Sequence, residues 1–297
     1  MHVVVVMPAR NEAALISQSV ASIPENVDWI VVVDDGSTDN TRNLAENALG
    51  DRGEVISTSG LGVGGAIEVG SKNALTRFGR NCVVVVMAGD GQMDPGDLPA
   101  VIRPVIEGRA DHVKGNRWLH PDGAKGMPLI RRVGTWWLSR LTSLASGVRI
   151  RDSQCGYTAT SGAMIADWDW SQSWQGYGYP NWWLMESGRR GFRIDEVAVK
   201  SIYADETSGI RIAKFLSSVS WMLWKGVWRR GIDWYIVSKD THPLLRLVAT
   251  TLWFGGWLAL LMALQQPTLL VAPPIAFLIL ARLDYKESKR RRGYVTA

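Results

Sequence analysis

Short apolar runs alternate with helical patterns along the first 110 residues of the chain. Runs rich in valine and isoleucine predict buried strands at residues 3–7, 29–33, 55–56 and 83–87. The segments between them predict helices at residues 11–23, 38–49, 64–78 and 94–108. Asn11 and Asp94 are the expected N-caps, with Pro95 at a first helical position and Gly50 and Gly108 as stops. Strands that alternate with helices predict an α/β fold with a mostly parallel sheet covered on both faces.

Residues 110–205 are less regular and rich in Gly, Trp and Arg. We expect them to extend the sheet and to form the acceptor side. Residues 209–237 return to helical spacing, with Trp221 and Trp224 close to Lys225. Tryptophan beside basic residues favours a helix in the membrane interface. A core-facing helix with ordinary aromatic packing is the alternative.

Residues 247–281 contain no charged side chain over 35 positions. A spanning helix needs about 20 apolar residues, and Gln265-Gln266-Pro267 divides the run. We therefore expect a transmembrane hairpin, with helices near residues 246–264 and 268–283. The second is short and contains Pro273-Pro274, so we expect it to be kinked or to dip into the bilayer. A helical hairpin buried inside a soluble protein is the alternative.

The domain organisation follows from these segments. We expect a catalytic domain at residues 1–208, interfacial helices at 209–240, the hairpin at 241–284 and a basic tail at 285–297. Met1 leads directly into the first strand without a basic n-region, so we expect the catalytic domain to stay cytoplasmic. Basic residues flank both outer ends of the hairpin, which places both termini in the cytoplasm of a multi-pass protein of the cell membrane.

The positive charge is concentrated at the C-terminal end. The formal net charge is +5, and residues 282–297 account for +4 of it. Next to a long apolar segment, this charge favours anchoring at an anionic membrane surface over a solvated tail. No nucleic-acid-binding motif accompanies it, so we expect no nucleic-acid partner. Cys82 and Cys155 have neither disulfide-framework nor zinc spacing.

Three polar clusters follow predicted strands, at residues 8–12, 34–39 and 88–94. The carboxyl ends of parallel strands meet at one edge, where ligands of such sheets bind. We therefore expect the clusters to line one crevice. Pro8, Ala9, Asn11 and Glu12 form the first cluster, whose backbone can line a base pocket.

The sequence GDGQMDP at residues 89–95 is the strongest signal for chemistry. Asp90 offers a carboxylate and Gln92 a side-chain carbonyl on the same side of an extended segment, and Mg²⁺ or Mn²⁺ prefers such hard oxygen ligands. Next to Ala88, Gly89 lets the backbone approach a ligand closely. A divalent ion can stabilise a diphosphate leaving group. Taken alone, Asp90 could equally be a turn residue, and Asp94 is assigned to capping.

Two further clusters suit a nucleotide. Residues 33–39 read VDDGSTD, and the carboxylates of Asp34 and Asp35 can accept hydrogen bonds from base and ribose. Asp39 is expected to cap the following helix. Residues 60–65 match G-x-G-x-x-G but follow the third strand rather than the first, with no acid at the spacing of a dinucleotide site. We interpret them as a flexible loop that places Gly64 near the phosphates.

Together these motifs resemble family 2 glycosyltransferases of the GT-A fold, in the branch that includes dolichol-phosphate mannose synthase. The resemblance covers residues 3–210. It rests on the motifs at residues 7–12, 33–39, 89–95, 114–117 (KGNR) and 152–157 (DSQCGY). It implies that Asp90 and Gln92 hold the metal and that Asp34 and Asp35 bind the nucleoside.

By the same resemblance, Asp90, Arg117 and Arg131 carry the catalysis, with the two arginines on phosphates of donor or acceptor. Guanidinium groups suit two-point contacts with phosphate, although surface solvation is the simpler role for each. Ala88 stands where many members have an acid, and tryptophans at 182–183 stand where an acid is common, with Glu186 further on. The metal affinity and the general base are therefore open.

The hypothesis is a membrane-bound transferase that moves a sugar from a UDP- or GDP-sugar to a polyprenyl- or dolichyl-phosphate. Inversion is implied by the resemblance. The expected cofactor is Mg²⁺ or Mn²⁺, and candidate contacts to the lipid phosphate are Arg131, Lys200, Arg211 and Lys214. Alternatives are a transferase that extends a lipid-linked glycan, a catalytically silent membrane scaffold or flippase partner, and, outside these, an NAD oxidoreductase. Whether the chain forms a homo-oligomer is left open by the sequence.

Overall fold

A seven-stranded mixed sheet forms the centre of the molecule. The computed structural model describes residues 1–202 and 212–294. The sheet order is β3-β2-β1-β4-β6-β5-β7, and only β6 runs antiparallel to its neighbours. The strands are β1 (His2–Ala9), β2 (Trp29–Asp34), β3 (Gly53–Ser57), β4 (Cys82–Val86), β5 (His112–Asn116), β6 (Thr158–Ser161) and β7 (Ile194–Ala198). The predicted mostly parallel sheet is confirmed, as is its extension by residues 110–205.

Alternation along the strands separates two apolar cores. Val3 and Val5 of β1 belong to one buried cluster, whereas Val4 and Val6 belong to another. Successive side chains of a strand point to opposite faces, so a central strand covered on both sides must be apolar at every position. This explains the uninterrupted valine run at residues 3–6.

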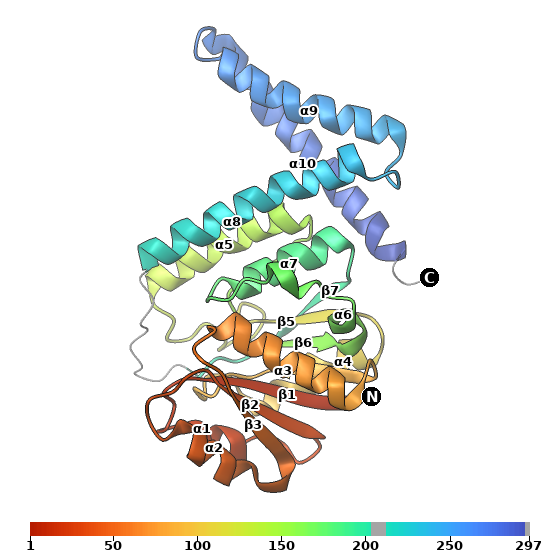
Figure 1. Ribbon diagram of the computed structural model, residues 1–297. Helices are drawn as coiled ribbons and strands as arrows, with labels where there is room; N and C mark the ends of the chain where they lie inside the picture. Colours follow the sequence, from red (N-terminus) through yellow and green to blue (C-terminus); the bar gives the residue numbers. More distant parts are fainter. Residues whose placement is uncertain (203–211, 295–297) are drawn as a thin grey trace.

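Helices cover both faces of the sheet (Figure 1). The cluster that contains Val5 is closed by α1 (Ile16–Ala21), α2 (Thr41–Leu49) and α4 (Leu98–Ile106). The cluster that contains Val4 is closed by α3 (Val63–Phe78) and α6 (Gly162–Ala166). Asp94 accepts a hydrogen bond from the N–H of Gly96, 2.9 Å away, and Pro95 follows it, so the predicted cap is confirmed at a 3-10 turn, η2 (Pro95–Asp97).

Two predicted helix starts are wrong. Asn11 does not cap a helix, because it adopts a left-handed conformation with φ of 58° and α1 begins only at Ile16. The helix expected from residue 38 begins at Thr41, whose N–H donates to the Asp39 carboxylate at 3.0 Å. Instead of starting a helix, Asn11 accepts from the N–H of Thr38 in the other loop. Asp39 accepts from the N–H of Ala13 at 3.2 Å as well as from Thr41.

A third layer, made of three helices, lies on the α3 side of the sheet. It consists of α5 (Leu129–Ser146), α7 (Tyr179–Arg190) and α8 (Ile212–Ile232), and Figure 1 shows α5 and α8 side by side. Trp168 stacks on Trp183 with ring centroids 4.0 Å apart, and Val219 and Leu223 of α8 are buried in the same cluster. Helix α8 therefore packs on the catalytic domain along one stripe, while Trp221 remains 60% exposed on another.

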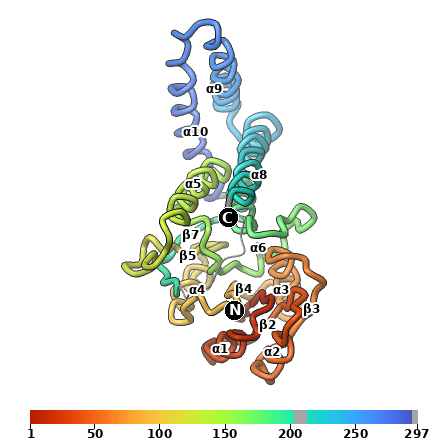
Figure 2. Tube along the Cα trace, turned by 90° about the vertical axis from the view of Figure 1, so that its left-hand side faces the viewer, coloured from red at the N-terminus to blue at the C-terminus, as the bar shows by residue number. Residues whose placement is uncertain are grey.

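The C-terminal hairpin projects away from the sheet (Figure 2). Helix α8 runs through a π-helical turn, η4 (Asp233–Val237), into α9 (Pro243–Met262), and a 3-10 turn, η5 (Pro267–Val271), leads into α10 (Ala272–Tyr294). The predicted break at residues 265–267 is confirmed. The expected short second helix is wrong, because α10 continues through Lys286 and Arg292. Pro273 and Pro274 fit because they stand in its first turn.

Both hairpin helices are long and apolar enough to cross a membrane. Their large side chains are exposed, with Leu258 at 58%, Leu264 at 85% and Leu278 at 67%. A hairpin buried inside a soluble domain would hide these residues, so that alternative does not fit the described structure.

Candidate donor and acceptor site

The first polar cluster, at the end of β1, contacts both of the other two clusters. The Asp35 N–H donates to the Ala9 carbonyl at 2.9 Å, and the Gly89 N–H donates to the Pro8 carbonyl at 3.2 Å. Pro8 and Ala9 therefore lie between the loop after β2 and the loop after β4. The sequence-based expectation that the three clusters converge on one edge of the sheet is confirmed.

Asp35 holds the loop that follows β3. Its carboxylate accepts hydrogen bonds from the Thr58 hydroxyl at 2.6 Å and from the N–H groups of Leu61 and Gly62 at 2.6 and 2.7 Å. Burial alone would raise the pKa of Asp35, but these bonds and the nearby charge of Arg10 lower it. Asp35 is therefore an ionised group that shapes the pocket wall. Its contact with the nucleoside stays a prediction.

Asp34 and the first cluster are joined by short polar contacts. The Asp34 carboxylate accepts from the N–H of Ser37 at 3.2 Å. The Asn11 side-chain carbonyl accepts from the N–H of Thr38 at 2.8 Å, and the Glu12 N–H donates to the Thr41 hydroxyl at 2.8 Å. These contacts bind residues 10–12 to residues 37–41, so the two loops form one continuous surface. The contact of this surface with a base stays a prediction.

Asp90 stands in a tight turn after β4. Gly91 has φ of 68°, and the Gln92 N–H folds back to the Asp90 carboxylate at 3.0 Å. The extended segment expected here is therefore wrong, although Asp90 and Gln92 stay adjacent. Gly89 is held by the Ser19 hydroxyl at 2.9 Å, and Ala88 beside it offers no ligand. The half-buried Asp90 carboxylate is placed at the edge shared with Pro8.

These residues fit a metal that is shared with a substrate. In the described part of the chain, no three His, Cys, Asp or Glu side chains gather into a metal-binding group. Mg²⁺ is commonly held by one or two carboxylates together with substrate phosphates and water. Asp90, with Gln92 beside it, can supply the protein share of such a coordination, whereas a complete protein cage is absent from residues 1–202 and 212–294.

The glycine-rich loop is docked against residues 174–176. The Gly64 N–H donates to the Gln175 carbonyl at 2.7 Å, and a Cβ on Gly64 would come within 2.1 Å of the Trp174 carbonyl oxygen. Glycine is required here for close backbone approach. The role of Gly64 in donor binding stays a prediction, because its N–H already has a partner in this conformation.

Arg117 is bound to Asp152 by a two-point ion pair. The Nε–Oδ2 distance is 2.7 Å and the Nη2–Oδ1 distance is 2.8 Å, with Asp152 fully buried. Burial would raise the pKa of Asp152, but the Arg117 charge and its hydrogen bonds outweigh this and lower it. The pair fixes Arg117 at the carboxyl end of β5. A phosphate contact by Arg117 stays a prediction.

Lys114 is a buried cation that the sequence reasoning did not single out. It has no exposed surface, donates to the Cys155 carbonyl, and burial lowers its pKa to about 8. The sequence feature that could have identified Lys114 is its position inside the strand-like KGNR motif. Two motifs that are distant in the sequence therefore meet here. Arg117 of the first motif pairs with Asp152 of the second, 35 positions further along the chain, and Lys114 bonds to Cys155.

The first turns of α5 and α8 bring candidate phosphate contacts together. The two helices run parallel, because the Trp137 indole donates to the Ser220 hydroxyl at 3.1 Å and Leu216 lies beside Gly134. Arg131 and Lys214, both exposed, therefore start adjacent helices at the same end. Lys200 is exposed just after β7, and Arg211 lies outside the described residues.

This end of the two helices faces the carboxyl edge of the sheet. Arg132 of α5 donates to the Ala124 carbonyl at 3.0 Å. The adjacent Gly123 lies against the carbonyls of Arg117 and Val199, which follow β5 and β7. The start of α5 is thus connected to the edge that carries Asp90 and Asp35.

Glu186 is not placed to serve as a general base. It is 1% exposed and forms ion pairs with Arg189 at 2.7 Å and Arg229 at 3.4 Å. Trp182 and Trp183 beside it are buried in the tryptophan cluster. This part of α7 has a structural role. Glu186 therefore does not take the place of the acid that many family members have at the position of Trp182 and Trp183.

Comparison with known proteins identifies a family. A model of the family described as Glycosyl transferase family 2 matches residues 4–166. The UDP-N-acetylglucosamine–dolichyl-phosphate N-acetylglucosaminyltransferase of Methanococcus voltae is 32% identical over 216 residues, which cover 67% of this chain and 85% of that protein. Glycosyltransferase AglJ of Haloferax volcanii is 30% identical over 66% of this chain and 61% of its own length.

The solved structures support the fold. A crystal structure of glucosyl-3-phosphoglycerate synthase from Mycobacterium tuberculosis, in complex with Mn²⁺, UDP and glucosyl-3-phosphoglycerate, superposes with a TM-score of 0.55. The match covers 77% of this chain and 79% of that chain, at 21% sequence identity. At this identity the likeness is one of fold, and it agrees with the GT-A architecture expected from the motifs.

Proposed function

Since the chain belongs to glycosyltransferase family 2, we propose that it is a membrane-bound, inverting enzyme that transfers a sugar from a UDP- or GDP-sugar to a polyprenyl- or dolichyl-phosphate. The observation that carries the proposal is the junction of two surfaces. The polar edge with Asp35 and Asp90 continues into the first turns of α5 and α8, which carry the exposed cations Arg131 and Lys214.

The outer surface beside this junction suits a lipid acceptor. Leu129, Ile130 and Val133 of α5 are 76%, 57% and 59% exposed. Large exposed apolar patches are characteristic of interaction sites with membranes or partners. The hairpin of α9 and α10 supplies two segments of spanning length. A phosphate group at the membrane surface would meet Arg131 and Lys214 while its hydrocarbon chain stays in the bilayer.

A lipid phosphate fits the absence of a suitable base at Glu186. A phosphate monoester is already anionic near neutral pH, so its oxygen can attack the anomeric carbon without losing a proton first. Asp34 and Asp35 would orient the nucleoside, and Arg117 would bind a phosphate. A divalent ion held by Asp90 and Gln92 would stabilise the charge of the departing diphosphate.

We place the catalytic domain and both ends of the hairpin in the cytoplasm. Lys239 and Arg246 precede or open α9, and Lys286 and Arg290 follow the apolar part of α10, whereas the turn at residues 263–271 has no charge. An excess of basic residues marks the cytoplasmic side of short loops. The acceptor named for the Methanococcus voltae relative also favours a dolichyl-phosphate-type lipid for this chain.

The test uses the full chain, purified in detergent, with Mn²⁺, polyprenyl phosphate and a panel of radiolabelled UDP- and GDP-sugars. We expect one donor to yield a labelled, organic-extractable lipid that mild acid hydrolyses. Polyprenol without phosphate is the matched acceptor control and should yield none. Two outcomes would contradict the proposal. One is labelled lipid that forms only when the acceptor is a preassembled lipid-linked glycan, and the other is no labelled lipid with any of the donors.

A further inference from the structure

A basic groove runs along α5, from Arg132 and Val133 in its early turns to the loop that follows it, where α10 meets the catalytic domain. It has a volume of about 1020 Å³. Its walls come from α5, from the loop at residues 147–151 and from the segment Ala281–Tyr285 of α10, with Trp118 after β5 and Arg230 of α8. Figure 2 shows α10 rising directly above α5. The groove therefore sits where the hairpin leaves the catalytic domain.

The groove is strongly positive. Five arginines line it: Arg132, Arg140, Arg149, Arg151 and Arg230. The lining contains one acid, Asp284, which already accepts from Arg230 at 2.6 Å and from the Tyr235 hydroxyl at 2.5 Å. Arg140 and Arg149 are exposed, and no carboxylate of the described residues lies within ion-pair distance of either. Their charge is thus available to an anion.

Arg230 adds a buried donor with no partner. Only 3% of this residue is exposed, and its Nε and Nη2 atoms are bonded to Ala145, Leu144 and Asp284. Nη1 is buried and has no hydrogen-bond partner among the described residues. It lies beside Gly147, where an added Cβ would be 3.1 Å away. Because buried donors are nearly always satisfied, this atom indicates a ligand that approaches through the groove.

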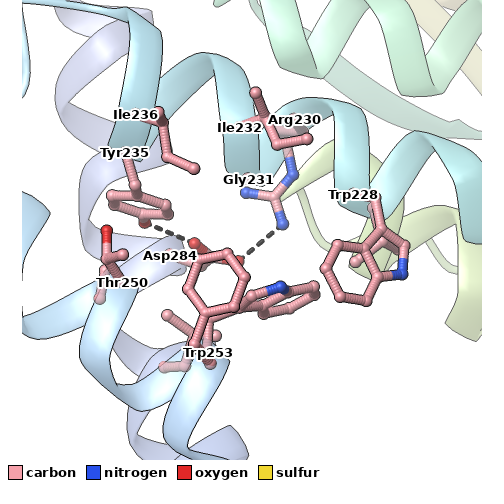
Figure 3. Close-up of a pocket in the computed structure, with 13 residues that line it drawn as sticks. Trp228, Arg230, Gly231, Ile232, Tyr235, Ile236, Thr250, Trp253 and Asp284 are labelled. Carbon is pink, nitrogen blue, oxygen red and sulfur yellow. Dashed lines mark hydrogen bonds and ion pairs between the residues drawn. The ribbon is translucent and has the colours of Figure 1, made fainter. Parts of the chain in front are cut away.

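An apolar pocket lies on the other side of the Arg230–Asp284 pair (Figure 3). It has a volume of about 300 Å³ and is lined by Trp228, Trp253 and other apolar side chains of α8, α9 and α10. In Figure 3 the Arg230 guanidinium and the Tyr235 hydroxyl both point to Asp284, which marks the boundary between charged and apolar surfaces. Trp136 and Leu144 of α5, 57% and 52% exposed, border the groove.

From these observations we propose that the groove binds the headgroup of an anionic phospholipid of the surrounding membrane. The phosphate would lie among Arg140, Arg149 and the unpartnered Nη1 of Arg230. Arginine suits this ligand because its planar donors match phosphate oxygens. The acyl chains would follow the apolar surface of α10 into the bilayer, past the level where Trp136 lies.

The end of the groove at Arg140 and Arg149 is separate from the proposed acceptor contacts at the first turns of α5. Val148 and Ile150 of its lining pack with Ile194, the first residue of β7, which runs parallel to β5. This part of the groove therefore lies at the amino edge of the strands, whereas Asp90 and Asp35 lie at the carboxyl edge. A phosphate held by Arg149 is at the opposite edge from Asp90 and Asp35, so we assign this end of the groove to a membrane lipid. The lining continues through Arg132 and Val133 toward the carboxyl edge.

The inference rests on the proposed membrane anchoring but not on sugar transfer, and its test needs no donor. The full chain in neutral detergent is mixed with phosphatidylglycerol or phosphatidylcholine, and retained lipid is counted by native mass spectrometry alongside the melting temperature. We expect one phosphatidylglycerol to be retained selectively, with a rise in Tm on the order of 5 °C. Inorganic phosphate, which lacks acyl chains, should not reproduce this rise.

Arg140→Gln/Arg149→Gln should abolish the selectivity and reduce retention of phosphatidylglycerol at least tenfold. The matched control, Arg42→Gln/Arg103→Gln, removes two exposed charges far from the groove and should leave retention unchanged. Equal retention by both double variants would overturn the proposal. So would displacement of phosphatidylglycerol by polyprenyl phosphate in stoichiometric amounts, because the groove would then belong to the acceptor. Loss of transfer activity with normal lipid retention would count against the proposed function alone.

Discussion

The two ends of the parallel helices α5 and α8 offer a comparison within one molecule. At the first turns, next to the carboxyl edge of the sheet, Arg117 is paired with the buried Asp152. At the last turns, Arg230 is paired with Asp284 of α10. Each end thus has one desolvated arginine–aspartate pair with further cations around it. The difference lies in what surrounds the pair.

At the sheet edge the polar groups are bonded mainly to one another. Asp35 is engaged by the loop at residues 58–62, and residues 10–12 are tied to residues 37–41. At the hairpin end, Arg140 and Arg149 of the groove have no carboxylate partner among the described residues, and the neighbouring apolar side chains are exposed. The first arrangement suits a preorganised pocket for a soluble, polar donor. The second suits a surface completed by lipid.

The largest expected effect comes from breaking the pair at the sheet edge. Asp152→Asn leaves the Arg117 guanidinium without its ionic partner and should destabilise the domain by about 3–5 kcal/mol. Donor affinity should fall with it, because Arg117 loses its position. Thermal unfolding and UDP binding by calorimetry measure both.

The matched variant at the other pair is Asp284→Asn. It should lower the melting temperature but leave UDP affinity unchanged, because Asp284 lies at the hairpin end. Equal losses of donor affinity in the two variants would show that the ends of α5 and α8 do not have separate roles.

A charge placed on the hairpin tests whether the hairpin is inserted in a lipid bilayer. Leu258→Arg puts a cation in the apolar C-terminal half of α9, on a side chain that is 58% exposed. Membrane insertion should become less favourable by about 3 kcal/mol, which carbonate extraction of membranes detects as released protein. The matched control is Ile106→Arg at the end of α4, 47% exposed, which should have almost no effect. Full retention of the Leu258 variant in the membrane would contradict the anchoring.

Removal of the strand-end carboxylate tests the donor edge alone. Asp90→Asn should reduce kcat/KM for sugar transfer roughly 100-fold, about 2.7 kcal/mol in activation free energy, because the metal loses its charged ligand. Asp94→Asn, four positions on, changes a capping residue and should cost less than about 1 kcal/mol in stability, with little change in metal-dependent turnover. Comparable activity losses in both variants would remove the special role of Asp90.

The smallest effect concerns the interior of the sheet. Burial, with the nearby charge of Lys114, lowers the pKa of His112 to about 3. The unfolded chain therefore binds a proton below about pH 6.5 that the folded chain does not, and stability is lost as pH falls from 6.5 towards 3. Between pH 6.5 and 5 this loss should be about 1–2 kcal/mol. His112→Asn, which can keep a bond to Thr160, should lack this component, and identical pH profiles for the two proteins would rule it out.

The parts of the structure that the sequence predicted are those set by local pattern. The valine run of β1 and the Asp94–Pro95 cap depend on neighbours in the chain, and the strand-end clusters converge because parallel strands share an edge. The Asn11 cap and the extended conformation at Asp90–Gln92 were mispredicted. Asn11 bonds to the distant loop at Thr38, and the Gln92 N–H turns back onto the Asp90 carboxylate.

Pairings between distant segments could not be predicted. Asp152 lies 35 positions from Arg117, and no local pattern links them. The exposed apolar face of α5 was equally hidden, because Trp136 and Val133 have the same spacing as core residues. Only the packing of α8 along the other side of α5 shows that this face is left uncovered. The domain limits and the roles of the site residues stay predictions.

The most direct measurement for the central claim is the anomalous X-ray signal of manganese in crystals of the full chain soaked with Mn²⁺ and UDP. The account predicts one strong peak within coordination distance of an Asp90 carboxylate oxygen and of the diphosphate, beside Gln92 and the carboxyl end of β1. A bound nucleotide with no manganese peak there, or with manganese held elsewhere, would contradict it.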